Sequence, residues 1–102
     1  MNPLQSRYAN KVAVITGAGG GIGRAACVRL ASEGASIVAV DLDETALAET
    51  AELVEGAGAA VHSVIADVGD ASQVQQYVDE AVASFGGIDL LFNNAGIMGQ
   101  VA

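Results

Sequence analysis

The sequence predicts an α/β protein in which parallel strands form a doubly wound sheet. Two observations support this prediction: apolar runs of strand length alternate with segments of helical period, and a glycine cluster joins the first strand to the first helix. Most of the apolar runs are nearly continuous, and such runs suit parallel strands that are covered on both faces. We therefore expect the first four strands and three helices of such a sheet, an incomplete copy of the fold.

Four apolar segments are expected to form the strands. Right-handed crossovers between consecutive strand–helix units would give the strands the spatial order 3-2-1-4. The first, second and fourth segments consist almost entirely of Val, Ile, Leu, Ala or Phe. The expected strands span residues 11–16, 36–41, 60–66 and 89–93.

Three segments of helical period are bounded by glycine and capping residues. The first helix is expected over about residues 21–32, with Gly34 after its end. The second follows Asp43, and the third is capped by Asp70, with Gln73 three residues later and glycines at its stop. The side chains expected to face the sheet are Ile22, Ala26 and Leu30, then Leu47, Ala51 and Val54, then Val74, Val78, Ala81, Val82 and Phe85.

Composition excludes several classes of protein. Twelve acidic and four basic side chains give a formal net charge of −8, so no nucleic-acid partner is expected. A lone cysteine, Cys27, cannot form an internal disulfide and suits a reducing compartment. With His62 as the only histidine, no zinc-ligand spacing is present, and no metal site is expected. No apolar run reaches the roughly 18 residues of a membrane span, so we expect a soluble, cytoplasmic protein without a membrane partner.

The glycine cluster is the main functional signal. Residues 16–23 read Thr-Gly-Ala-Gly-Gly-Gly-Ile-Gly and lie between the first strand and the first helix. Glycines let the backbone approach a ligand closely, and the start of a helix offers free N–H groups to a phosphate. A bound dinucleotide is therefore the leading interpretation. The alternative is a flexible strand-to-helix turn, and a short glycine motif alone does not separate the two.

Asp41 ends the second strand, at the position where a carboxylate can accept hydrogen bonds from the adenosine ribose. Its charge would repel the 2′-phosphate of NADP, and neither Gly20 nor Leu42 and Asp43 offer a compensating base, which favours NAD. The alternative role of Asp41 is to cap the second helix, which Asp43 can also do. Arg24 is the only nearby cation, and it either touches phosphate or is a solvated helix residue.

The ordered motifs resemble the N-terminal half of a short-chain dehydrogenase/reductase. They are Thr16-Gly17-x-x-x-Gly21-Ile22-Gly23, Asp41, Asp67-Val68 after the third strand, and Asn93-Asn94-Ala95-Gly96 after the fourth. The glycines at 17, 20 and 23 also fit the spacing of the sugar-nucleotide epimerase branch, whereas the Asn-Asn-Ala-Gly segment favours the single-domain dehydrogenase branch. The resemblance implies a Rossmann-like fold, with residues 1–10 as an N-terminal extension and 11–102 as the N-terminal part of one NAD-binding domain.

The resemblance also implies roles for single residues. Pyrophosphate would lie along the glycine loop, ribose at Asp41, and adenine between Asp67 and Val68. The alternative role of Asp67 is that of a turn residue at the end of the strand. The alternative role of Asn93 and Asn94 is structural, because their side-chain amides can hydrogen-bond the end of the central strand to neighbouring backbone. The expected cofactor-binding residues are Gly17, Gly19, Gly21, Ile22, Gly23, Asp41, Leu42, Asp67, Val68, Asn94, Ala95 and Gly96.

The family's catalytic residues are not found in this sequence. The family uses a Tyr, a Lys four residues later and an upstream Ser, all beyond the Asn-Asn-Ala-Gly segment. Lys11 is the only lysine, and Tyr8 stands three residues before it. We therefore expect hydride transfer between NAD and an alcohol or ketone in a longer, homo-oligomeric enzyme, with this piece inactive alone. The alternative is a noncatalytic module that binds NAD or a partner at this length.

Overall fold

The sheet has four parallel strands in the order β3-β2-β1-β4, as predicted. The structure is a computed structural model that describes residues 7–94. The strands are β1 (Val12–Thr16), β2 (Ser36–Asp41), β3 (Val61–Ile65) and β4 (Leu90–Asn93), and the helices are α1 (Gly21–Ser32), α2 (Glu44–Gly56) and α3 (Ala71–Phe85). Each expected element is present, and three of the strands are one or two residues shorter than expected.

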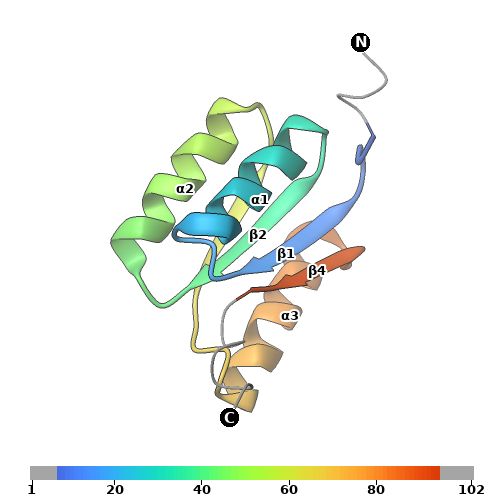
Figure 1. Cartoon of the computed structure of the whole chain (residues 1–102). Helices are drawn as coiled ribbons and strands as arrows, with labels where there is room; N and C mark the ends of the chain where they lie inside the picture. Colours follow the sequence, from blue (N-terminus) through green and yellow to red (C-terminus); the bar gives the residue numbers. More distant parts are fainter. Residues whose placement is uncertain (1–6, 95–102) are drawn as a thin grey trace.

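Helices cover both faces of the sheet, as a doubly wound fold requires. Figure 1 shows α1 and α2 side by side on one face and α3 on the other. Alternate residues of β1 and β2 point to opposite faces, so Ala13 and Ile15 pack under α1 and α2 while Val12 and Val14 pack against α3. The near-continuous apolar runs of these strands thus fill two separate cores.

The predicted inner stripe of α1 was wrong in phase by one residue. The buried positions are Gly23, Cys27 and Ala31, whereas Ile22 is 68 % exposed. Ala26 and Leu30 lie at the edge of this stripe and pack partly against the core. The helix turns this way because Gly23 must contact the backbone of the preceding loop, which leaves Ile22 facing outward.

The inner faces of the other two helices also differ from the prediction. In α2, Leu47 and Val54 are buried as expected, but the third buried side chain is Thr50, and Ala51 is only half-buried. In α3 the buried residues are Ala81 and the unpredicted Tyr77. The remaining predicted side chains of α3 are half-buried at Val74, Val78 and Phe85, and 49 % exposed at Val82.

The phase of α2 can be tested with two leucines of the same helix. Leu47 is 2 % exposed and Leu53 is 48 % exposed. We expect Leu47→Ala to lower the free energy of unfolding by about 2–5 kcal/mol, because it leaves a cavity in the core. Leu53→Ala should cost less than about 1 kcal/mol. Chemical denaturation measures both values, and equal losses would contradict the observed phase of α2.

A hydrogen bond between β3 and α3 predicts a dependence of stability on pH. His62 Nε2 lies 2.7 Å from Glu80 Oε1, and this hydrogen bond, with a second from Gln76, lowers the pKa of Glu80. A lowered folded-state pKa adds stability above the ordinary glutamate value of about 4.3, and this stability is lost as the pH falls through the lowered pKa.

We therefore expect Glu80→Gln to lower the free energy of unfolding at pH 6 and to reduce its decline on acidification. Denaturation curves between about pH 6 and 3 measure the effect. Glu52→Gln, at an exposed position of α2, is the control and should leave the acid limb unchanged. An acid limb that is the same in Glu80→Gln and in the unsubstituted protein would rule out this role of the pair.

Candidate nucleotide-binding site

The loop between β1 and α1 is built on glycine geometry. Gly17 and Gly21 have φ angles of 65° and 55°, in the left-handed region that glycine adopts most readily. A Cβ on Gly23 would lie 2.0 Å from the carbonyl oxygen of Gly17. The start of α1 therefore packs directly on the loop backbone, closer than any side chain would allow.

The N-terminus of α1 lacks the side-chain cap that the other helices have. Asp43 caps α2 by accepting from the Ala46 N–H at 3.0 Å, and Asp70 caps α3 by accepting from the Ser72 N–H at 2.9 Å. Gly20, at the cap position of α1, makes no side-chain cap hydrogen bond, and the first turn holds no acidic residue. A Cβ added at Gly20 or Gly21 would meet nothing within 4 Å. The loop thus offers open space and the positive end of a helix dipole, which fit an anionic phosphate.

Asp41 is joined to this loop. Its Oδ2 accepts from the Gly19 N–H at 2.7 Å, and its Oδ1 accepts from the Asp43 N–H at 3.0 Å. Because Asp43 caps α2, the alternative that Asp41 is the helix cap is wrong. Leu42 follows with an exposed side chain. The carboxylate therefore lies at the rim of the loop.

Thr50 is a part of this site that sequence reasoning missed. Its side chain is fully buried, and its hydroxyl donates to the carbonyl oxygen of Ala18 at 2.7 Å. The same hydroxyl accepts a hydrogen bond from Arg24 Nε at 2.9 Å, so Arg24 is bonded to protein groups and is not simply a solvated helix residue. A threonine within the apolar stripe of α2 was the only signal in the sequence.

Asp67 and Val68 follow β3 at the same end of the sheet. Asp67 Oδ1 accepts from the Gly69 N–H at 2.8 Å, and the Asp67 N–H donates to Gln73 Oε1 at 2.6 Å. Gln73 thus holds the turn before α3. Val68 is half-buried against the core under α3. Asp67 serves as a turn residue in this structure, and its carboxylate is exposed.

At the end of β4 the asparagines flank the central strand. The Thr16 hydroxyl donates to Asn93 Oδ1 at 3.1 Å, which ties β4 to the last residue of β1. Asn94 follows, and its N–H donates to the Phe92 carbonyl at 3.1 Å. The expected residues Ala95 and Gly96 lie outside the described residues.

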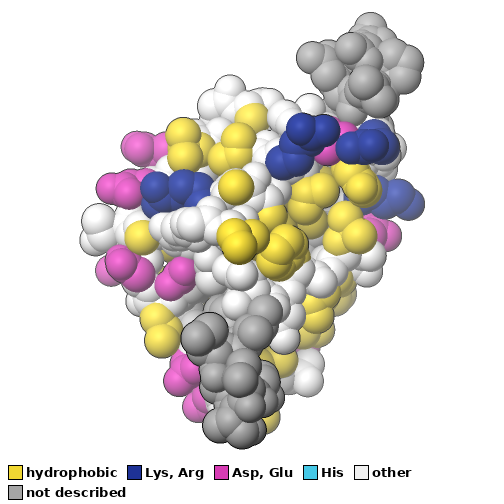
Figure 2. Space-filling model, viewed as in Figure 1, with side chains coloured by type: hydrophobic (Ala, Val, Ile, Leu, Met, Phe, Trp, Pro, Cys, Tyr) yellow, Lys and Arg dark blue, Asp and Glu magenta, His cyan; other side chains and the backbone are white. Residues whose placement is uncertain are grey.

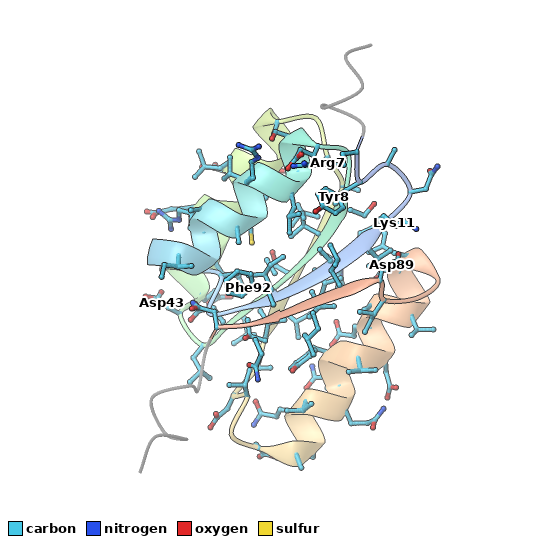
Figure 3. All side chains as sticks on the ribbon, turned by 45° about the vertical axis from the view of Figure 1, so that its right-hand side comes forward. Arg7, Tyr8, Lys11, Asp43, Asp89 and Phe92 are labelled. Carbon is cyan, nitrogen blue, oxygen red and sulfur yellow. The ribbon has the colours of Figure 1, made fainter. Side chains whose placement is uncertain are left out.

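The parallel sheet brings the predicted residues to one end. Thr16 pairs with Val40 and Asn93, and Asp41 pairs with Ile65, so the carboxyl ends of all four strands meet. Figure 3 shows Asp43 and Phe92 at this end and Tyr8, Lys11 and Asp89 at the other. Tyr8 and Lys11 therefore lie far from the glycine loop.

Three further properties of residues 7–94 bear on function: the reactivity of Cys27, metal binding and the capacity of the helices to cross a membrane. Burial raises the pKa of the Cys27 thiol to about 12, which makes it a poor nucleophile. No group of three or more His, Cys, Asp or Glu side chains that could hold a metal ion occurs among the described residues. None of the helices in that part of the chain is long and apolar enough to cross a membrane.

The comparisons with known proteins agree with this geometry. The family model of the short chain dehydrogenases matches residues 11–102, and the chain belongs to this family. The resemblance found in the sequence is thereby confirmed.

Among characterised relatives, levodione reductase from Leifsonia aquatica is 46% identical over 93% of this chain and 36% of its own length. Cyclohexanol dehydrogenase from an Acinetobacter species is 36% identical over 96% of this chain and 39% of its own. The NAD⁺-bound structure of a xylitol dehydrogenase has a TM-score of 0.86 and 42% identity, covering 88% of this chain and 35% of that one. The chain thus spans little more than a third of the length of these relatives.

The contact between α1 and the loop can be tested with two glycines. Gly23→Ala places a methyl group against the Gly17 carbonyl, so we expect a loss of about 1–3 kcal/mol in the free energy of unfolding. Gly20→Ala meets open space at an extended φ of −173° and should cost less than about 1 kcal/mol. Thermal or chemical denaturation measures both, and a Gly23→Ala protein as stable as Gly20→Ala would refute the close packing.

Proposed function

We propose that this chain is the cofactor-binding part of an NAD-dependent oxidoreductase that transfers hydride between NAD and an alcohol or a ketone. The observation that supports this best is the junction of Asp41 with the glycine loop through the Gly19 N–H, at 2.7 Å. NAD, when bound, supplies the hydride acceptor or donor. Relatives whose structures hold NAD include the xylitol dehydrogenase and a carveol dehydrogenase from Mycobacterium avium.

In this proposal the loop holds the pyrophosphate. Gly17, Gly21 and Ile22 lie along it, and the uncapped start of α1 supplies N–H groups and dipole charge. Gly23 keeps the helix close, and Gly19 leaves room for Asp41, whose Oδ2 would lie 2.8 Å from a Cβ at position 19. Each of these four positions thus has a physical reason for glycine in the proposed site.

Asp41 would select NAD over NADP. A carboxylate has about four lone-pair sites for hydrogen bonds, and two N–H groups occupy part of this capacity. The remainder can accept the two ribose hydroxyls, with Leu42 beside them. A 2′-phosphate at the same place would meet a negative charge, and the nearest cation, Arg24, is already hydrogen-bonded to protein groups.

The remaining contacts concern the adenosine end. Asp67 and Val68 would border the adenine, with the exposed carboxylate directed to its amino group. Asn94, Ala95 and Gly96 would line the floor of the site near the adenosine ribose. The parallel register that brings these strand ends together supports this assignment.

The whole enzyme would act on a small-molecule alcohol or ketone and form a homo-oligomer in the cytoplasm. Residues 1–102 hold no Tyr followed four residues later by Lys, so we infer that they do not catalyse turnover by themselves. Catalysis would need the Ser, Tyr and Lys of a longer chain.

Nucleotide binding tests the proposal. We expect the intact protein to bind NAD more tightly than NADP, measured by isothermal titration calorimetry. Asp41→Asn keeps an acceptor for the Gly19 N–H but removes the charge, so it should weaken NAD binding by about 10-fold or more and narrow the preference over NADP.

Asp79→Asn is the control for this experiment, because Asp79 is an exposed carboxylate of α3 whose hydrogen bond is to Gln75. It should leave both affinities unchanged. A protein that binds neither nucleotide, or an Asp41→Asn variant with an unchanged preference, would overturn the proposed function.

A further inference from the structure

Arg24 lies on the first turn of α1 and connects the glycine loop to α2. Its Nη2 donates to the carbonyl oxygens of Gly19 at 2.6 Å and Ala46 at 2.9 Å, and its Nε donates to Thr50 Oγ1 at 2.9 Å. Glu49 Oε1 lies 3.2 Å from the same Nη2 and offsets its charge. The guanidinium is therefore held by backbone and side-chain acceptors on two elements.

The loop is fixed at two successive carbonyls by this arrangement. Arg24 holds the carbonyl of Gly19, and Thr50 holds the carbonyl of Ala18 at 2.7 Å. The N–H of Ala18 in turn donates to the carbonyl of Val40 at 3.0 Å. Both loop residues are thus tied to the second strand–helix unit, which also carries Asp41.

Gly19 is hydrogen-bonded to both Arg24 and Asp41. The carbonyl of Gly19 accepts from Arg24, while its N–H donates to Asp41 Oδ2 at 2.7 Å. A Cβ at this residue would lie 2.8 Å from Asp41 Oδ2 and 3.0 Å from the Ala46 Cβ. Gly19 therefore lies between the last residue of β2 and the first turn of α2, with no room for a side chain.

The Gly19 N–H shares its planar peptide unit with the Ala18 carbonyl, which accepts from the Thr50 hydroxyl. Arg24 Nε donates to that same hydroxyl. Loss of Arg24 would free both this hydroxyl and the Gly19 carbonyl, so the Gly19 N–H would be free to turn away and release one oxygen of the Asp41 carboxylate.

We infer that Arg24 is a positioning residue for cofactor choice: by holding the Gly19 carbonyl and the Thr50 hydroxyl, it fixes the peptide units on both sides of Gly19 and keeps the Asp41 carboxylate oriented toward the ribose and against a 2′-phosphate. This inference rests on the proposed NAD-binding function. Arg24 acts through Gly19 and Thr50 and needs no contact with the cofactor. It raises the preference for NAD although its positive charge, if free, would favour NADP.

The test compares two arginines of the same helix. Arg29 is 72 % exposed and pairs with Glu33, away from the loop. In the intact protein, Arg24→Ala should weaken NAD binding by about 10-fold and lower the ratio of the NADP Kd to the NAD Kd by threefold or more. Arg29→Ala should change neither value. Isothermal titration calorimetry with both nucleotides measures these quantities.

A second cycle separates positioning from general destabilisation. In an Asp41→Asn background, Arg24→Ala should leave the Kd ratio unchanged, because the charge that it orients is gone. If Arg24→Ala fails to fold, Thr50→Val decides. It removes the hydroxyl that accepts from Arg24 Nε and donates to the Ala18 carbonyl, with little change of volume, and it should lower the ratio in the same direction.

Each outcome has a definite meaning. An unsubstituted protein that binds neither nucleotide would overturn the proposed function and this inference together. An unsubstituted protein that prefers NAD, with Arg24→Ala weakening both nucleotides by the same factor, would overturn the inference alone. A lowered ratio in Arg24→Ala that disappears in the Asp41→Asn background would support it.

Discussion

A single hydrogen bond, from the Gly19 N–H to Asp41 Oδ2 at 2.7 Å, joins the glycine loop to the end of β2. The rest of the candidate site depends on it, because it connects the group that would hold pyrophosphate to the group that would hold ribose. The bond requires glycine at position 19, since a Cβ there would lie 2.8 Å from the accepting oxygen. It also requires β1 and β2 to be parallel neighbours in register, so that Thr16 and Val40 end together.

That register is held by the two cores of the sheet. Ala13, Ile15, Ile37 and Ala39 fill one face, and the alternate valines of the same strands fill the other. A slip of one residue would move each set to the opposite face, where the helices present different shapes. The outer strand β4 is different, because Leu90, Leu91 and Phe92 stay partly exposed. Figure 2 shows hydrophobic side chains gathered on the face where β1 and β4 lie.

The strand order, the elements and the family could be predicted from the sequence because they follow from local signals. Apolar runs gave the strands, and Asp43, Asp70 and the glycines marked the helix ends. The phase of α1 could not be predicted, since hydrophobic residues occur around much of this helix. Its phase is set by contact between Gly23 and the Gly17 carbonyl, which belongs to the tertiary structure.

The hydrogen bonds of Thr50 and Arg24 that hold the loop could not be predicted from the sequence either. Thr50 breaks the apolar pattern of α2, and its burial is explained only by the Ala18 carbonyl, which lies 32 positions earlier in the chain. Arg24 shows the same limit: its neighbours in sequence suggest a solvated helix residue or a phosphate ligand, whereas its acceptors come from the loop and from α2. Long-range hydrogen bonds of this kind carry no periodic signature. Tyr77 was missed for a related reason, because a tyrosine fits both a core and a surface.

The most direct test of whether the glycine loop and Asp41 form a nucleotide site is an NMR titration of ¹⁵N-labelled intact protein with NAD. We expect the largest amide shift changes at Gly17, Gly19 and Gly21–Gly23, with further changes at Leu42 and at Val68, around one end of the sheet. Little change is expected at the opposite end, near Lys11 and Asp89. Changes confined to that opposite end, or saturation with NAD without a change at the Gly19 amide, would contradict a nucleotide site at the loop.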